Sequence, residues 1–370
     1  MLVTLAAPGG AQVASTTSAP PPPPPKAWLL ADADTGAVLS VSNDREPKPV
    51  ASLSKIVTAL AVVHALKPGT DIPVSAKAEG MPARKINMKA GQVWTLEDSL
   101  TSMLLSSAND AAVALAERAS GSLEAFIGDL DATASRIGMQ DHPVLRDPAG
   151  LDDEFSVDGG NLISARDLAI AARALLHDKR LAQLVASDDA RFVGGDAIQH
   201  HLINHNRLLR TYPGAIGVKT GYTRKAGHSL IAAAKRDGRT MIAVVFGAAD
   251  PDRSAAALLD KGFGTPLTAE VRELERLPDI SHGNANDPVT KAPPPPRPVS
   301  TPTRAQLASV HPAHLREWAI LALGGFPALL ILALRLRAKA RVKRRRRSRS
   351  SAGPALVTPP RHDVIGTAAY

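Results

Sequence analysis

The amino-acid sequence predicts a mixed α/β (α+β) fold, in which an antiparallel sheet is flanked by helices and carries an inserted all-helical lobe. The prediction depends on the order of three kinds of segment. Strand-like runs open the folded part, helix-like runs fill its middle, and strand-like runs followed by one helix close it. Strands from the two ends of the chain then meet in one sheet, and the helices between them form the lobe.

The opening strands are expected within residues 28–41, on either side of a turn at Asp34-Thr35-Gly36. An Asp-Thr-Gly loop also occurs in aspartic proteases. Those enzymes need two such loops with paired carboxylates, and this chain has only one. We therefore interpret the tripeptide as a turn.

Helix-like segments fill the middle of the chain. The first is apolar enough to be buried, and the second opens on Thr95-Leu96-Glu97-Asp98, which resembles a capping box. Ser122 and Ser164 are expected N-caps of later helices. The expected helices cover residues 51–66, 95–105, 110–119, 123–137, 165–177 and 181–186.

The closing strands are expected at residues 229–234 and 240–246. A hairpin signal, Lys235-Arg236-Asp237-Gly238, joins them. A last helix is expected at residues 254–261. These segments complete the sheet that the opening strands begin.

Composition divides the rest of the chain. Residues 1–19 are expected to be a degenerate or truncated signal segment, because they have a short apolar run and small residues but no basic n-region. An unbroken proline run makes residues 20–26 a stiff spacer, and the Pro-rich residues 265–315 form a linker. The folded domain is expected between them, at residues 27–264.

Residues 316–336 are expected to form a transmembrane helix. Within them, the 17 residues from Trp318 to Leu334 carry no charge, and as a helix they would be about 25 Å long. The dense Lys/Arg run that follows is typical of the cytoplasmic side of a membrane span. We expect a single-pass protein of the cell membrane, with an extracytoplasmic domain and a basic cytoplasmic tail at residues 337–370. A buried soluble helix and a nuclear-localisation or nucleic-acid-binding tail are the alternatives.

The charge and the cysteine count exclude several functions. The formal net charge is +9, but it comes from the C-terminal end of the chain, because residues 335–370 contain 11 Lys and Arg and one acidic residue. The rest of the chain has 33 basic and 34 acidic residues, a net charge of −1. A neutral body disfavours nucleic acid as a partner. The chain has no cysteine, which excludes disulfides and thiol catalysis. His200, His201 and His205 have no metalloprotease pattern around them, and we predict no metal and no cofactor.

Ser52 and Lys55 lie at the start of the first expected helix, three residues apart and therefore on one face. A serine hydroxyl is a poor nucleophile without a base beside it, and a lysine is a base only when it is neutral. Burial among the apolar residues 56–60 would lower the pKa of Lys55, and Lys219 is a candidate second cation with the same effect. A surface lysine and a helix-capping serine are the alternative.

Two further motifs carry polar groups suited to binding a substrate. Ser107-Ala108-Asn109 lies between two expected helices, where it can relay a proton and bond a substrate amide, cap the following helix, or do both. Lys219-Thr220-Gly221 offers a charge and a hydroxyl to a carboxylate, and Gly221 allows a substrate backbone to approach. An exposed turn is the alternative for this third motif.

In this order, the three motifs resemble those of the low-molecular-mass penicillin-binding proteins, the serine-type D-alanyl-D-alanine carboxypeptidases. The resemblance covers roughly residues 28–264 and implies the serine β-lactamase/penicillin-binding-protein-like fold. It extends beyond the motifs themselves. The segments similar to the family are residues 51–60, 106–111, 147–151, 164–169, 204–209 and 212–223.

The resemblance implies catalytic roles for four residues. Ser52 attacks the carbonyl between the two D-alanines that end a peptidoglycan stem peptide, and Lys55 takes its proton. Ser107 helps to return a proton to the leaving D-alanine, and Asn109 holds the substrate amide. β-Lactams would acylate the same Ser52 as covalent inhibitors.

The resemblance also implies the residues that bind the substrate. Lys219 and Thr220 bind the terminal carboxylate beside Gly221, and the backbone N–H of Tyr222 joins that of Ser52 in an oxyanion hole. Arg253 is a weaker extra candidate for the carboxylate.

Three alternative functions share these motifs. A class A β-lactamase also needs a loop Glu followed by x-x-Leu-Asn, and neither Glu124 nor Glu154 has that context. A D,D-endopeptidase or transpeptidase would use the same residues. A non-enzymatic membrane β-lactam sensor would signal through the spanning helix, although residues 335–370 are short and basic for a signalling domain.

Overall fold

The structure, a computed structural model, describes residues 24–152, 160–266, 268 and 274–280. The chain divides into two units, residues 1–287 and 288–370, and every described residue belongs to the first. The predicted signal segment, transmembrane helix and basic tail lie outside the described residues, as do most of the proline spacer and most of the linker. None of the helices that are described has both the length and the apolar character needed to cross a membrane.

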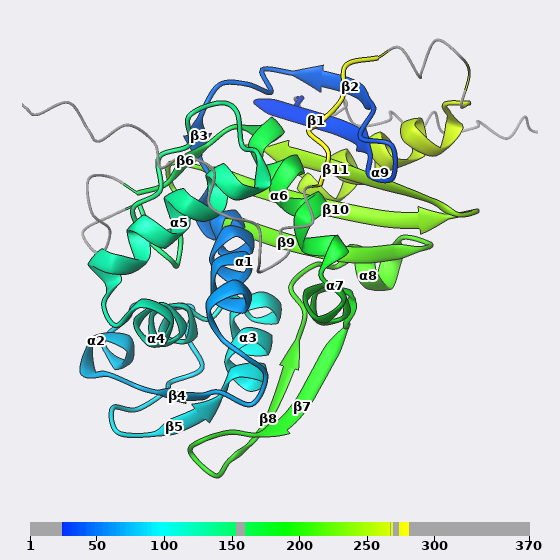
Figure 1. The fold of residues 1–370 in the computed structure, drawn as a ribbon. Helices are drawn as coiled ribbons and strands as arrows, with labels where there is room; N and C mark the ends of the chain where they lie inside the picture. The colour runs from blue at the N-terminus through cyan, green and yellow to red at the C-terminus, as the bar shows by residue number, and fades with distance from the viewer. Residues whose placement is uncertain (1–23, 153–159, 267, 269–273, 281–370) are drawn as a thin grey trace, which may run out of the picture. The chain divides into compact units, whose positions relative to one another are not determined.

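One five-stranded antiparallel sheet joins the two ends of the described chain, as the sequence predicts (Figure 1). Its order is β2-β1-β11-β10-β9, and the first strand pairs with the last one, β11, from Ala27 opposite Phe246 to Asp32 opposite Met241. The strands are β1 (Ala27–Asp32), β2 (Val38–Ser42), β9 (Ala215–Thr223), β10 (Gly227–Arg236) and β11 (Arg239–Phe246). The closing hairpin forms at residues 236–239.

Three two-stranded ribbons add to this sheet, and the sequence did not predict them as pairs. They are β3 (Lys48–Pro49) with β6 (Leu162–Ile163), β4 (Asp71–Pro73) with β5 (Val93–Thr95), and β7 (Asp189–Val193) with β8 (Gln199–Ile203). Their strands have two to five residues, which is too short for a clear period-2 pattern.

The predicted helices form, with one change at the first. Residues 51–54 make a 3₁₀ turn, η1, before the α-helix begins at Lys55. The predicted caps Thr95, Ser122 and Ser164 each accept a hydrogen bond from the backbone N–H three residues later. The helices are α1 (Lys55–Ala65), α2 (Ala76–Glu79), α3 (Leu96–Leu105), α4 (Asn109–Ser120), α5 (Leu123–Ile137), α6 (Ala165–His177), α7 (Lys179–Ala186), α8 (Leu208–Thr211) and α9 (Pro251–Gly264).

The sheet is covered on both faces. Alternate residues of β1 point to opposite sides, so Leu29 and Ala31 join the apolar core shared with α1 and α6, whereas Leu30 packs with Ala255 and Leu259 of α9. Figure 1 shows α6 and α9 on the two sides of the sheet, and α2 to α5 with the β4–β5 ribbon forming the helical lobe. The predicted architecture is therefore confirmed for the described residues.

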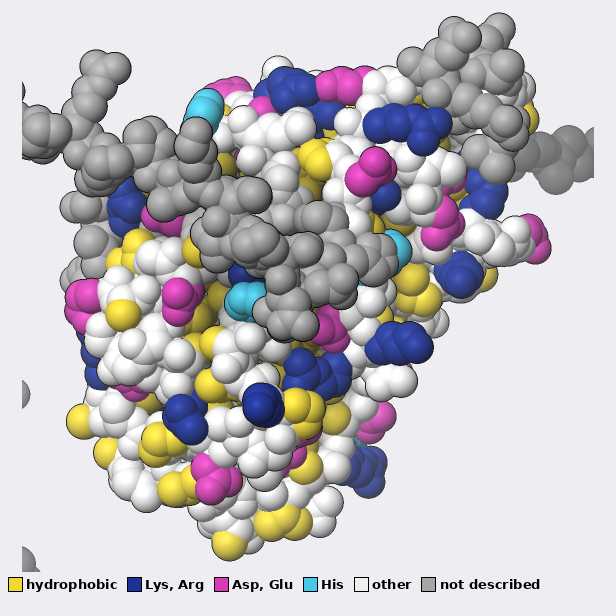
Figure 2. Space-filling model, viewed as in Figure 1, with side chains coloured by type: hydrophobic (Ala, Val, Ile, Leu, Met, Phe, Trp, Pro, Cys, Tyr) yellow, Lys and Arg dark blue, Asp and Glu magenta, His cyan; other side chains and the backbone are white. Residues whose placement is uncertain are grey.

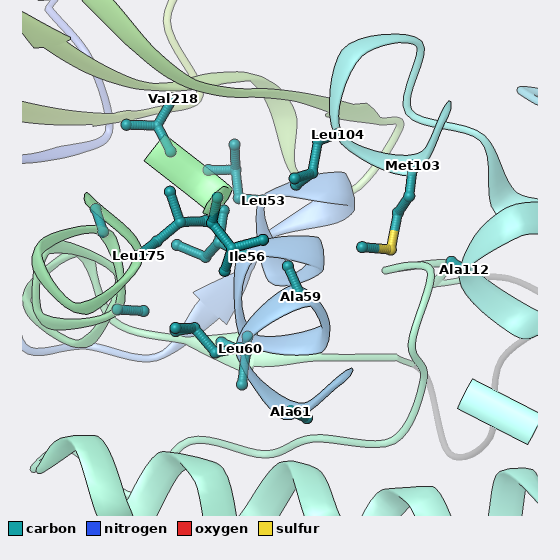
Figure 3. Close-up of a cluster of buried hydrophobic side chains, with 14 of the residues drawn as sticks. Leu53, Ile56, Ala59, Leu60, Ala61, Met103, Leu104, Ala112, Leu175 and Val218 are labelled. Carbon is teal, nitrogen blue, oxygen red and sulfur yellow. The ribbon is translucent and has the colours of Figure 1, made fainter. Parts of the chain in front are cut away.

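Helix α1 lies inside the described domain and is buried from Lys55 to Val62. Figure 3 shows Leu53, Ile56 and Ala59 surrounded by side chains of α3, α4, α6 and β9, among them Met103 and Leu175. Packing on all sides restricts the movement of this helix. Ser52 and Lys55, at its N-terminal end, are therefore held on a rigid element.

Charged side chains of both signs are interspersed over the face shown in Figure 2. This distribution agrees with the net charge of −1 outside residues 335–370. The described part of this face therefore does not present the one-sided basic surface that is typical of nucleic-acid binding.

Candidate active site

Ser52 and Lys55 meet at the junction of η1 and α1. The ammonium nitrogen Nζ of Lys55 lies 3.0 Å from Oγ of Ser52. Ser52 is half-buried, and its hydroxyl is not used as a helix cap, because the cap position of η1 is Val50. The preceding Ala51 has a φ of 50°, a left-handed conformation that side chains disfavour and that often marks a functional turn.

Lys55 is fully enclosed and has three acceptors. Besides Ser52, Nζ donates to Oδ1 of Asn109 at 2.8 Å and to the carbonyl oxygen of Ala149 at 2.5 Å. Burial lowers the pKa of Lys55 to about 7, against the opposing charges of Asp147 and Asp110. A fraction of the molecules therefore carries a neutral Lys55 at neutral pH, as a general base requires.

The loop at residues 147–151 supplies the Ala149 carbonyl. Asp147 shapes this loop, because Oδ1 accepts the backbone N–H groups of Ala149 at 2.7 Å and of Leu151 at 3.0 Å. Gly150 has a φ of 77° and lies so close to η1 that a β-carbon would overlap the carbonyl group of Ala51. A glycine is therefore required at this contact.

Asn109, at the start of α4, connects Lys55 to a third segment. Its side-chain oxygen accepts from Lys55, and its Nδ2 donates to the carbonyl oxygen of Pro82 at 3.1 Å. Ser107 is 5% exposed with a φ of 62°, and within the described part of the chain its hydroxyl makes no hydrogen bond. Neither residue caps α4 through its side chain, because the N-cap is Ala108.

The third motif lies on β9, the edge strand of the sheet, which packs against η1. A β-carbon at Gly221 would lie 3.1 Å from the carbonyl oxygen of Val50, so this glycine allows the close approach. Thr220 is half-buried. Tyr222 is 59% exposed, and its ring lies 4.4 Å from that of His228 on β10.

Lys219 is 1% exposed and donates from Nζ to the carbonyl oxygen of Thr220 at 3.1 Å. Burial, followed by the charges of Lys55 and Arg84, lowers its pKa well below 10.5. Burial lowers the pKa of Lys55, as predicted, whereas the predicted effect of a second cation is seen on Lys219, whose pKa is lowered by the charge of Lys55.

The structure separates the histidines that suggested a metal site. His200 contacts Asp196, His201 contacts Asp189, and His205 contacts Arg84. Across residues 24–152 and the described segments that follow, His, Cys, Asp and Glu form no group of three or more that could hold a metal ion.

Arg253, the weaker candidate for the carboxylate, is exposed in the first turn of α9, and its backbone N–H donates to Oδ1 of Asp250. By contrast, the Ala149 carbonyl and the pair of Arg84 and His205 were not predicted as site groups. The similarity of residues 147–151 and 204–209 to the family was the only sequence signal for them.

Comparisons with known proteins agree with this geometry. The family model described as D-alanyl-D-alanine carboxypeptidase (peptidase S11) matches residues 14–250. The chain is 34% identical over 271 residues to the D-alanyl-D-alanine carboxypeptidase DacF of Bacillus subtilis, covering 71% of this chain and 68% of that protein. It is 32% identical over 255 residues to DacB2 of Mycobacterium tuberculosis, covering 67% and 86%. It covers a smaller share, 56%, of DacC from Escherichia coli.

Solved structures share the fold. A D-alanyl-D-alanine carboxypeptidase from Mycobacterium tuberculosis superposes with a TM-score of 0.62 at 29% identity, over 68% of this chain and 96% of that one. A variant of the Streptomyces K15 DD-transpeptidase shares the fold with a TM-score of 0.60 at 23% identity, over 66% of this chain and 100% of that one. The fold is therefore the penicillin-binding/β-lactamase-like fold, and the chain belongs to the peptidase S11 family of D-alanyl-D-alanine carboxypeptidases.

Proposed function

We propose that Ser52 and Lys55 perform the serine D-alanyl-D-alanine carboxypeptidase reaction in this chain, removing the last D-alanine of peptidoglycan stem peptides. The observation that carries this proposal is the set of three acceptors around Nζ of Lys55. A neutral amine has two N–H groups and one lone pair. If Asn109 and Ala149 accept the two N–H groups, the lone pair points at the Ser52 hydroxyl, 3.0 Å away.

Acylation follows from this arrangement. Oγ of Ser52 forms a bond to the carbonyl carbon between the two D-alanines, and its proton moves to Nζ of Lys55. The C–N bond then breaks, and the departing amine of D-alanine receives that proton from Lys55 through the hydroxyl of Ser107. The products of this step are an ester on Ser52 and free D-alanine.

Hydrolysis restores the enzyme. Water attacks the ester carbon as Lys55 takes a proton from it, and the C–O bond to Ser52 breaks as Oγ regains a proton. We infer that the backbone N–H groups of Ser52 and Tyr222 stabilise the oxyanion in both steps. We infer that the polar groups of Lys219 and Thr220 contact the substrate carboxylate beside Gly221, where an extended peptide aligns with the edge strand β9.

β-Lactams would enter the same reaction and stop at the ester. A class A β-lactamase needs a carboxylate that activates the deacylating water. The carboxylates whose charges act on Lys55 are Asp147 and Asp110. Asp147 accepts a backbone N–H of its own loop, and Asp110 accepts the backbone N–H of Met88. This engagement favours slow release of penicillin over rapid turnover.

A fluorescent penicillin and a peptide ending in D-Ala-D-Ala test the proposal together. We expect stoichiometric labelling, loss of labelling in Ser52→Ala, many D-alanines released per protein, and slow hydrolysis of a cephalosporin. Labelling of Ser52→Ala would refute the nucleophile assignment. Rapid cephalosporin turnover would favour a β-lactamase, transfer to an added amine would favour a transpeptidase, and labelling without D-alanine release would favour a sensor.

We also propose that residues 316–336 anchor the protein in the cell membrane, with the catalytic domain outside. The uncharged run within them and the basic run after it support this proposal. Fractionation of the full-length protein tests it. We expect release from membranes by detergent only, so release by high salt or alkaline carbonate would contradict a spanning helix.

A further inference from the structure

Asp147 carries a buried carboxylate that only one residue, Ala149, separates from the proposed general base. Its Oδ1 accepts the backbone N–H of Ala149 at 2.7 Å, and the carbonyl oxygen of the same Ala149 accepts Nζ of Lys55 at 2.5 Å. Asp147 is 6% exposed. A carboxylate that water hardly reaches therefore holds the residue whose carbonyl orients Lys55.

Further hydrogen bonds fix the loop that contains Asp147. Next to the Ala149 carbonyl, the carbonyl oxygen of Pro148 accepts the hydroxyl of Thr58 on α1 at 2.8 Å. Asn161 holds the start of the loop, because its Oδ1 accepts the backbone N–H of Asp147 at 3.1 Å and its Nδ2 donates to the carbonyl oxygen of Asp147 at 2.7 Å. The backbone of Asp147 is therefore fixed at both of its polar groups, and its carboxylate has a defined place relative to the base.

The charges of Asp147 and Lys55 act on each other. Among the described residues, no ion pair involves the Asp147 carboxylate; burial raises its pKa, and the charge of Lys55 opposes that rise. Burial in turn lowers the pKa of Lys55 to about 7, and the charges of Asp147 and then Asp110 oppose that fall. On the β9 side, burial and then the charge of Lys55 lower the pKa of Lys219. Asp147 is therefore the first of the groups that keep Lys55 basic.

We propose that Asp147 is a positioning residue for the general base: its hydrogen bonds hold the Ala149 carbonyl against Nζ of Lys55, and its negative charge sets the pH at which Lys55 has a free lone pair. The proposal rests on the proposed function and deepens it. A base is most effective when its pKa lies near the working pH, and a buried lysine without a counter-charge loses basicity. Asp147 offsets part of that loss.

Asp147→Asn tests the charge, because asparagine keeps the acceptor Oδ1 and removes the negative charge. The second-order rate constant of Ser52 acylation by penicillin is measured between about pH 5 and 9, and the midpoint of the profile is compared with that of the wild type. We expect the midpoint to move about 0.5 to 1 pH unit towards acid, with the plateau lowered by no more than about threefold. The midpoint does not depend on the fraction of protein that is folded.

Asp147→Ala tests the hydrogen bonds, because it removes the acceptor as well as the charge. The backbone N–H groups of Ala149 and Leu151 then lose their partner, and the Ala149 carbonyl is no longer held against Lys55. We expect the midpoint to move in the same direction as in Asp147→Asn, and the plateau to fall about 10- to 100-fold. The difference between the plateaus of the two variants measures the positioning role.

Asp167→Asn is the matched control. Asp167 is also buried, its carboxylate accepts the backbone N–H groups of Gln140 at 2.6 Å and Asp141 at 3.1 Å, and burial raises its pKa as well. Its charge is not among those that act on Lys55. The substitution should therefore leave the midpoint of the acylation profile unchanged, even if it lowers the stability of the domain.

Three results would overturn the inference: an unchanged midpoint in Asp147→Asn, an equal shift in Asp167→Asn, or a wild-type plateau in Asp147→Ala. Failure of the proposed function is a separate result. If the wild-type chain is acylated by penicillin but releases no D-alanine, the carboxypeptidase proposal fails. A midpoint that still moves in Asp147→Asn would then leave the role of Asp147 in place.

Discussion

At the scale of single residues, the surroundings of Lys55 convert an ordinary ammonium group into a base. Two carbonyl oxygens from distant parts of the chain, those of Asn109 and Ala149, take hydrogen bonds from it. Burial removes water from the charged ammonium of Lys55 and lowers the pKa of this residue to about 7. The residue therefore gains its function from contacts that the helix alone does not supply.

The rate of Ser52 acylation should depend on pH through this pKa. Below about pH 7, Lys55 is protonated and lacks the lone pair, so the rate constant should fall about tenfold per pH unit, and above it the rate should level off. Stopped-flow acylation by penicillin between pH 5 and 9 measures the profile. Lys55→Arg, which stays charged, should lose acylation at every pH, whereas a flat wild-type profile would contradict the general-base role.

Local spacing explains which site residues could be predicted. Ser52 and Lys55 are three residues apart, and helix geometry alone brings them together. The Ala149 carbonyl, 94 residues from Lys55, and His205, 121 residues from Arg84, arrive through tertiary packing. A backbone carbonyl leaves no mark on the residue type, so only the similarity of residues 147–151 to the family pointed to this loop.

At the scale of elements, the site depends on how closely the loop at residues 147–151 packs on η1. Gly150 makes this contact with a left-handed backbone and no side chain. The contact keeps the Ala149 carbonyl within reach of Lys55. The geometry of the base is therefore set by a loop, and the sequence predicted only the helix on which the base sits.

Gly150→Ala should therefore impair catalysis. The added β-carbon would meet the Ala51 carbonyl and lie 2.6 Å from Oγ of Ser54, so the loop must move and Ser52 acylation should slow about 100-fold. Gly121→Ala is the matched control, because Gly121 has a similar φ of 80° with nothing within 4 Å of a β-carbon. Equal acylation by the two variants would show that the contact is unimportant.

Helices and strands were predicted correctly where neighbouring residues in the sequence carry the pattern. The capping residues and long apolar faces predicted the helices, and alternating apolar residues predicted the strands of the main sheet. The 3₁₀ turn at residues 51–54 was missed, because it depends on packing against β9 and on a left-handed Ala51. The two-residue strands β3 and β6 were missed because only their pairing with each other, across more than 100 residues of sequence, makes them strands.

At the scale of the whole molecule, segments far apart in sequence close the described domain. Residues 274–280, within the predicted linker, return to the β1–β2 turn, where Leu277 donates its backbone N–H to Gly36 at 2.9 Å. Arg166 of α6 joins the same region, because it pairs with Asp44 at 2.8 Å and with Glu275 at 2.9 Å. Its side chain is 2% exposed, so the sheet edge, α6 and the returning segment share one buried cation.

Arg166→Ala should therefore destabilise the domain as a whole. The substitution leaves the carboxylate of Asp44, which is 12% exposed, without its positive partner. The free energy of unfolding should fall by about 3–5 kcal/mol. The midpoint of thermal unfolding should fall by roughly 6–20 °C. The control is Arg207→Ala, which breaks an ion pair with Asp252 whose arginine is 71% exposed, and solvent should make that loss small. If both variants unfold at the same temperature, the buried pair contributes no more than a surface pair, and the closure of the domain depends on apolar packing instead.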